Sequence, residues 1–545
     1  MERMCTPTPS ILATLQRSWK VYVQVGDFAP FCLQILTPFP VPVGRFNASS
    51  KQTIPSEFAS KIPSIAFSVP DIALQATLEL KRLDDGTNVG CVVADLSNGK
   101  SIDSVAITYI AAGIVGAALL ISAATSVLSA LSGASGGPGE QVQSSPSFTT
   151  MVGWFQGIAT TGMASVTYPA LYQSFTERFA FSTGLVTWEG MQRSIDSFRA
   201  KTGGNVTASS VDTLKQSTSS ALNSTTKLLI RQTTQTPINP EITKTLGISK
   251  YVEDNGITQE NAFMTIFLIT MIIILTIIVF LLLFKAILEA WAVFGNFPAS
   301  LTGFRKHYWG SIFRTVVMLI NLIFPIWVLY SIYQFRNGDP WGANLLAGIT
   351  LAIFAGTLIF FIVRIYMTAR AQIKLTGSAS RLFEDKAMWL KYSLFYDNLK
   401  KETWWFFAAY IFYSVLRNVF VAALSGKGMV QTIAVLACDV IMLVIMCFLR
   451  PFAHRTENVV HITIQVVRVA TWGAILVFVD ELKVERSTQT IMGFALVIVT
   501  SILTVLLVGL MLFNGIYQCV KDNPHRKRRK EAGKFPPPII QQQKN

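Results

Sequence analysis

The fold of this chain is decided by three consecutive apolar segments, WWFFAAYIFYSVLRNVFVAAL at 404–424, MVQTIAVLACDVIMLVIMCFL at 429–449 and VVHITIQVVRVATWGAILVFV at 459–479. At about 1.5 Å per residue, each is long enough to cross a hydrocarbon core of roughly 30 Å as a helix. Each also carries one ionised side chain well inside it: Arg417, Asp439 and Arg468. A charge in mid-bilayer costs from ~3 to over ~10 kcal/mol unless it is paired or hydrated. We therefore expect the three side chains to face one another inside a helix bundle.

The depths of the three charges predict how they pair. If the segments alternate in direction, Asp439 and Arg468 lie about eleven residues from the same membrane face and Arg417 about seven, at depths of roughly 16 and 10 Å. Asp439 is therefore predicted to meet Arg468, with Arg417 a turn away. The cluster is either a structural ion pair that locks three helices together, or part of a polar pathway for an ion or an anionic solute.

Composition places the chain among multi-pass membrane proteins. Of its 545 residues, 51% are hydrophobic and 14% charged, against about 25% charged in soluble domains. The formal net charge is +15, but the basic residues lie in short loops beside the apolar segments, so nucleic-acid binding is not expected. The sequence contains no phosphate-binding loop, metalloprotease or serine-hydrolase motif and no cysteine or histidine cluster with metal-ligand spacing. We expect no enzyme, no metal site and no covalently bound cofactor.

Further apolar stretches raise the number of predicted spans to nine; they are 104–131, 148–175, 262–288, 312–334, 343–366 and 489–513. The stretch 148–175 is weak, and a re-entrant segment is the alternative to a crossing. Its Gly153, Gly157 and Gly162 suit close helix packing in lipid. Pro325 is predicted to kink its span. The predicted fold class is a polytopic α-helical membrane protein with a small N-terminal all-β domain, a partial sandwich.

Basic loops and glycosylation sequons predict one orientation. Lysine and arginine concentrate at 285–306, 364–401, 450–455 and 525–530, which places these segments and the C-terminus in the cytosol. The sequons at Asn47, Asn205 and Asn223 share the opposite side if two spans separate the first from the others, which favours 148–175 as a crossing. The predicted domains are a luminal β domain at 1–103, two spans with a Gly/Ser-rich linker at 104–175, a luminal glycosylated loop at 176–261, a seven-helix bundle at 262–515 and a basic, disordered cytosolic tail at 516–545.

Residues 1–103 are predicted to be β-structure. VYVQV, SIAFSV, LQATLEL and VGCVVADL are short runs with many β-branched residues, interrupted by Pro, Gly, Asp and Asn. MERMCTPTPSILATLQRSWK contains no apolar core long enough for a secretory leader. Either the first span targets the chain, or sequence before Met1 supplies the leader, and we favour the second.

Three long stretches of the chain carry a resemblance to a known family; they are YPALYQSFTERFAFSTGLVTWEGMQRSIDSFRAKTGGN at 168–205, FYDNLKKETWWFFAAYIFYSVLRNVFVAAL at 395–424 and CFLRPFAHRTENVVHITIQVVRV at 447–469. These stretches resemble the fungal flavin-carrier proteins, also called transient-receptor-potential-like or polycystin-like membrane proteins. IPSIAFSVPDI at 62–72 and CVVADLSNGKSID at 91–103 resemble the second half of the ML-like lipid-recognition domain of that family. The first strands of that domain are not recognisable here, so we expect it to be truncated.

The resemblance implies a luminal β-sandwich, nine spans and a cytosolic tail. It also implies transport of flavin adenine dinucleotide (FAD) into the endoplasmic reticulum, with links to calcium homeostasis and cell-wall upkeep. The expected location is the endoplasmic reticulum membrane; the plasma membrane or another secretory-pathway membrane is the alternative. An oxidising lumen, together with the resemblance of both regions to the ML-like domain, predicts a disulfide between Cys32 and Cys91.

Three functions are open at this point. A flavin carrier ranks first, because an anionic dinucleotide needs cations along its path and Arg417 and Arg468 outnumber Asp439. A calcium-permeable TRP-like cation channel ranks second. Cation selectivity usually uses rings of acidic residues, and Asp439 is the only acidic residue at the centre of a predicted span. A non-transporting, lipid-binding membrane organiser in cell-wall maintenance ranks third. The expected partners are membrane lipids, with a sterol or phospholipid at the luminal domain, and a homo-oligomer is left open.

Overall fold

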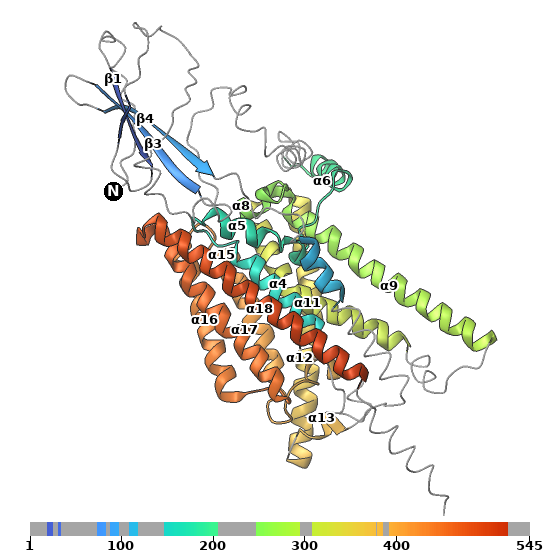
Figure 1. The fold of residues 1–545 in the computed structure, drawn as a ribbon. Helices are drawn as coiled ribbons and strands as arrows, with labels where there is room; N and C mark the ends of the chain where they lie inside the picture. The colour runs from blue at the N-terminus through green and yellow to red at the C-terminus, as the bar shows by residue number, and fades with distance from the viewer. Residues whose placement is uncertain are drawn as a thin grey trace, which may run out of the picture. The chain divides into compact units, whose positions relative to one another are not determined.

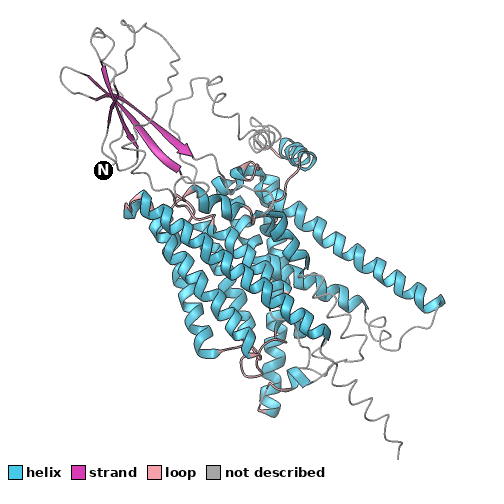
Figure 2. Cartoon of the chain, viewed as in Figure 1, coloured by secondary structure: helices cyan, strands magenta, loops and turns pink. Residues whose placement is uncertain are grey.

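The structure is a computed structural model that describes residues 19–25, 31–33, 73–82, 88–97, 108–117, 146–204, 247–294, 308–377, 379–384 and 392–520. The chain divides into two compact units: Met1–Ser104 with Pro169–Ser174, and Val105–Tyr168 with Phe175–Asn545. The first contains the strands and the second contains the long helices (Figure 2).

The first unit contains a four-stranded antiparallel sheet with the strand order β2-β1-β3-β4. Its strands are β1 (Trp19–Val25), β2 (Phe31–Leu33), β3 (Ala73–Arg82) and β4 (Asn88–Ser97). The predicted strands VYVQV, LQATLEL and VGCVVADL lie within β1, β3 and β4, where β-branched residues suit the extended backbone. The fourth, SIAFSV, lies outside the described residues.

The register of this sheet bears on the predicted disulfide. Cys32 on β2 pairs with Tyr22 on β1, Tyr22 with Glu79 on β3, and Glu79 with Cys91 on β4. The cysteines therefore lie about three strand spacings, or about 14 Å, apart. The Cα atoms of a disulfide lie within about 7 Å of each other. The predicted Cys32–Cys91 bond does not fit this sheet, because β1 and β3 separate the two strands that carry it.

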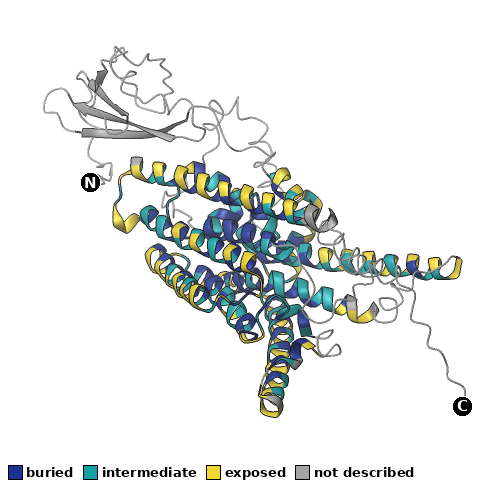
Figure 3. Ribbon diagram, turned by 60° about the horizontal axis from the view of Figure 1, so that its bottom comes forward, coloured by how far each residue is buried: buried dark blue, intermediate teal, exposed yellow. Residues whose placement is uncertain are grey.

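In the second unit, seven helices of the described chain are long and apolar enough to cross a membrane. They are α9 (Ala262–Phe294), α11 (Tyr308–Asn337), α12 (Trp341–Thr376), α15 (Phe406–Ala423), α16 (Gly428–Leu449), α17 (Arg455–Ile475) and α18 (Arg486–Val520), all labelled in Figure 1. They coincide with the seven spans predicted from residue 262 onward. Figure 3 shows buried residues on their inner faces and exposed residues on their outer faces. Many of the exposed residues are apolar, as lipid-facing positions require.

The predicted span at 148–175 is not one continuous helix. Helix α4 (Phe148–Thr161) has 14 residues and ends at Gly162, and α5 (Ala170–Glu177) follows after a bend. At about 1.5 Å per residue, α4 covers about 21 Å, less than the roughly 30 Å of a hydrocarbon core. A Cβ atom at Gly162 would overlap the Thr176 hydroxyl, so the close packing there requires glycine. Of the predicted first span, 104–131, the structure describes a helix at Thr108–Ala117.

The segment after α4 packs against the turn between α15 and α16, at what we call the α15–α16 end of the bundle. The Ser165 amide donates to Gln431 Oε1 at 2.7 Å, and Gln431 Nε2 donates to the Val421 carbonyl at 2.6 Å. The Ser165 hydroxyl accepts from the Gly426 amide at 2.8 Å. Helices α6 (Glu189–Lys201) and α8 (Ile248–Asp254) lie within the predicted loop 176–261, so part of this loop is helical.

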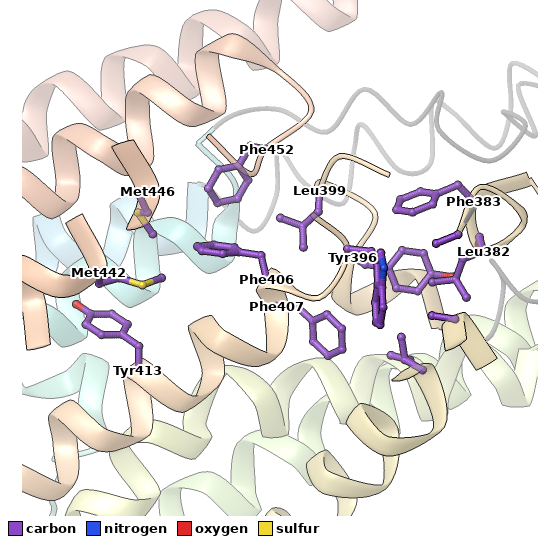
Figure 4. Close-up of a cluster of buried hydrophobic side chains, with 14 residues drawn as sticks. Leu382, Phe383, Tyr396, Leu399, Phe406, Phe407, Tyr413, Met442, Met446 and Phe452 are labelled. Carbon is purple, nitrogen blue, oxygen red and sulfur yellow. The ribbon is translucent and has the colours of Figure 1, made fainter. Parts of the chain in front are cut away.

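At the opposite, α16–α17 end, buried aromatic and aliphatic side chains form a hydrophobic cluster (Figure 4). It joins α15 and α16 to the short helix α13 (Arg381–Glu384) and to the turn between α16 and α17. An isolated β-bridge between Leu399 and Phe452 ties the chain preceding α15 to that turn. Tyr413 also belongs to the cluster, and this residue connects it to the charged centre of the bundle.

Candidate functional site: a buried charge core

The three predicted charges lie on three helices that pack side by side. Arg417 is on α15, Asp439 on α16 and Arg468 on α17. Asp439 is fully buried and Arg417 is 5% exposed, whereas Arg468 is half-buried. All three lie well inside their helices, so ionised groups do gather in the middle of this bundle.

Asp439 makes its ion pair with Arg417 rather than with the predicted partner, Arg468. Arg417 Nε lies 3.4 Å from Asp439 Oδ1. Among the described residues, no carboxylate lies within 4.0 Å of the Arg468 guanidinium.

The direction in which helical side chains lean explains this difference. Side chains lean toward the N-terminus of their own helix. Helix α16 begins at the α15–α16 end, whereas α15 and α17 begin at the α16–α17 end. Along the bundle axis, the side chains of Asp439 and Arg417 therefore point toward each other, whereas the side chain of Arg468 points away from Asp439.

Two uncharged residues hold the Asp439 carboxylate and its backbone. The Tyr413 hydroxyl donates to Asp439 Oδ1 at 2.6 Å. Gln465 Nε2 donates to the Tyr413 oxygen at 3.0 Å and to the Asp439 carbonyl at 2.9 Å. The sequence prediction omitted both residues. A signal was present, since Tyr413 precedes Arg417 by four residues and Gln465 precedes Arg468 by three, spacings that share a helix face.

Helix α4 forms one wall of the site. Arg468 Nη2 donates to the Gly153 carbonyl at 3.2 Å, and Arg417 Nη1 donates to Thr160 Oγ1 at 3.5 Å. A Cβ atom at Gly157 would lie 3.5 Å from Arg468 Nη2, an ordinary van der Waals distance, so the guanidinium lies against α4 at this glycine. Of the three glycines that predicted close helix packing, Gly157 lies against the Arg468 guanidinium, Gly162 lies against Thr176, and Gly153 has open space beside it.

Several buried polar atoms at this site have no hydrogen-bond partner within the described part of the chain. They are Arg417 Nε and Nη2, Asp439 Oδ2, Arg468 Nε and Trp472 Nε1. The Trp472 ring is fully buried, with the Arg417 guanidinium carbon 5.6 Å from its centroid. A buried polar group without a partner costs about 1–3 kcal/mol. We call Tyr413, Arg417, Asp439, Gln465, Arg468 and Trp472 the charge core.

The remaining predicted site residues lie elsewhere. Pro325 is inside α11, which continues through it, and its predicted kink stays a prediction. Asn47, Asn205 and Asn223 lie outside the described residues. Within the described ranges, no group of three or more metal-ligating side chains occurs.

Taken together, the long apolar helices and the charge core define a multi-pass helical membrane protein whose bundle encloses ionised groups. Residues 107–535 match the family model described as the transient receptor potential (TRP) ion channel, and residues 26–102 match an ML-like domain. The chain belongs to this TRP family, whose members are membrane channels and carriers rather than enzymes.

Curated relatives are distant and carry two kinds of name. Flavin carrier protein 2 of Saccharomyces cerevisiae is 26% identical over 493 residues, which cover 86% of this chain and 62% of that protein. The TRP-like ion channel protein flc1 of Cryptococcus neoformans is 23% identical, over 84% of this chain and 63% of that protein. The TRP-like ion channel pkd2 of Schizosaccharomyces pombe is 24% identical, over 86% of this chain and 66% of that protein. The chain spans less than two thirds of the length of each. No solved structure matches it.

Proposed function

We propose that this chain carries an anionic solute across its membrane, with FAD as the first candidate and the endoplasmic reticulum as the membrane. One observation carries the proposal: the charge core holds two guanidinium groups and one carboxylate, and the carboxylate pairs with Arg417. Arg468 is held through Nη2 by the Gly153 carbonyl, and no carboxylate in the described part of the chain lies within 4.0 Å of its guanidinium. The centre of the bundle is thus net positive.

Energetics support a role beyond packing. A cation in mid-bilayer costs about 3 kcal/mol or more, and a carbonyl offsets less of this cost than a carboxylate would. A passing anion would gain from the same charge. FAD contains a diphosphate group, and several matching relatives are named flavin carriers.

A calcium-permeable channel is the second candidate, because other matching relatives are named TRP-like ion channels. The core argues against ranking it first. Its one carboxylate, Asp439, is already paired with Arg417 and hydrogen-bonded by Tyr413, so it offers little to a passing cation.

Liposomes that contain the full-length chain test both candidates side by side. We expect uptake of FAD, measured by its fluorescence inside the liposomes after external FAD is removed, that exceeds uptake by empty liposomes. We expect no matching calcium flux, measured with an internal calcium indicator. Calcium flux without flavin uptake would overturn the proposal in favour of the channel.

A further inference from the structure

We infer that Arg417, Arg468 and Trp472 form a binding site for a phosphoryl oxyanion in the middle of the bundle. This inference rests on the proposed function and deepens it, because it names the chemical group of the solute that the charge core would hold.

The three side chains are neighbours. Arg468 and Trp472 are four residues apart on α17 and therefore share a face of that helix. Arg417 reaches across from α15 and places its guanidinium carbon 5.6 Å from the centroid of the Trp472 ring. Both arginines also contact one face of α4, at Gly153 and Thr160. The two guanidinium groups and the indole thus surround one region between α4, α15 and α17.

The unsatisfied atoms in this region are mostly donors. Arg417 Nε and Nη2, Arg468 Nε and Trp472 Nε1 are N–H groups without a hydrogen-bond partner among the described residues. Among the described residues of the charge core, the one unsatisfied acceptor is Asp439 Oδ2, whose carboxylate is already paired with Arg417. Guanidinium groups match phosphate in both charge and geometry. Arg417 Nε faces Asp439 Oδ1 at 3.4 Å, which leaves three N–H donors beside one neutralised carboxylate. This arrangement suits an oxyanion and not a cation.

The depth of the site favours a soluble solute over a lipid headgroup. Arg468 lies ten residues from one end of the candidate span Arg455–Phe478 and thirteen from the other. At about 1.5 Å per residue, these separations are about 15 and 20 Å. Lipid phosphates lie at the membrane surface, so the oxyanion at this depth belongs to a solute.

Binding of inorganic diphosphate to the full-length chain in phosphatidylcholine nanodiscs tests the inference by calorimetry. We expect wild-type protein to bind and Arg468→Gln to lose binding. Trp472→Phe keeps the ring against Arg417 but removes the N–H, so we expect about tenfold weaker binding, comparable to one lost hydrogen bond. Arg193→Gln removes an exposed arginine and should bind like wild type. Thermal melting of each variant checks that it is folded.

The outcomes separate this inference from the proposed function. Equal diphosphate affinity in wild type, Arg468→Gln and Trp472→Phe would place binding elsewhere and overturn the inference. Absence of binding, with FAD uptake intact, would mean that water alone satisfies the donors; the proposed function would stand. Variant-sensitive binding without FAD uptake would overturn the proposed function and leave the oxyanion site. Displacement of diphosphate by phosphatidic acid in the nanodiscs would assign the site to lipid and overturn the assignment to a solute.

Discussion

Replacing Asp439 with Asn removes the core carboxylate and leaves Arg417 buried without its partner. The two side chains are 0% and 6% exposed, and Arg417 Nε lies 3.4 Å from Asp439 Oδ1. At an effective dielectric constant of about 20, unit charges 3.4 Å apart attract by about 5 kcal/mol. Stranding one member of a buried pair costs about 3–5 kcal/mol. We therefore expect Asp439→Asn to lower the free energy of unfolding by about 3–5 kcal/mol.

The assay is reversible unfolding in mixed micelles, applied to Asp439→Asn, Arg417→Gln and the double variant. The double variant should recover stability relative to Asp439→Asn, because no unpaired charge of this pair remains. The exposed pair Lys401–Glu384 is the matched control; its nitrogen and oxygen are 2.9 Å apart and its side chains 55% and 59% exposed. Glu384→Gln should cost at most about 1 kcal/mol.

Two results would refute the assigned pairing of Asp439. The first is a loss in Asp439→Asn no larger than the loss in Glu384→Gln. The second is a double-variant cycle in which Asp439 couples to Arg468 and not to Arg417, since interacting residues couple by about 0.5–3 kcal/mol.

Three further predictions concern neighbouring parts of the structure. Tyr413→Phe removes the hydroxyl that donates to the core carboxylate and should lower the free energy of unfolding by about 1–3 kcal/mol; an unchanged value in the same assay would show that the carboxylate does not need this donor. Gly428→Ala adds a Cβ atom that would overlap the backbone of the segment after α4, and should destabilise by about 1–3 kcal/mol. Gly473→Ala adds a Cβ atom where no other atom lies within 4 Å, so this variant should melt close to wild type. Identical losses of stability in Gly428→Ala and Gly473→Ala would argue against close packing at Gly428. In sealed microsomes, a tag near Asn223 should resist protease and a tag at the C-terminus should be cleaved; cleavage of both would contradict the predicted orientation.

The sequence predicts the seven long helices and the ionised residues inside them, because apolar length and mid-bilayer charge are strong signals. The pairing within the core is not predictable from depth alone. Depth gives the position of each residue's backbone along the membrane normal. The Arg417–Asp439 pair also depends on side-chain direction, because side chains on antiparallel helices lean in opposite directions. Tyr413 and Gln465 could have been found from their helical spacing to the arginines.

Other features needed the tertiary structure. Hydropathy measures the apolar length of 148–175 but shows neither that α4 ends before Gly162 nor that Gly162 packs closely against Thr176. Trp472 counts as an apolar residue in the sequence. Only the structure shows that its indole N–H is buried and that no group in the described chain accepts a hydrogen bond from it. The Cys32–Cys91 pairing rested on family resemblance, which does not contain the strand order that separates the two residues.

The most direct test of the central claim, that the charge core provides a path for an anion, is FAD uptake by liposomes containing Arg468→Gln or Arg468→Lys. Both variants keep the Arg417–Asp439 pair, so we expect both to fold. Loss of the Arg468 charge should reduce flavin uptake by Arg468→Gln at least about tenfold, equivalent to about 1.4 kcal/mol of lost stabilisation along the path, and Arg468→Lys should restore part of it. Wild-type uptake by folded Arg468→Gln would contradict the claim and make the core a structural feature of the bundle.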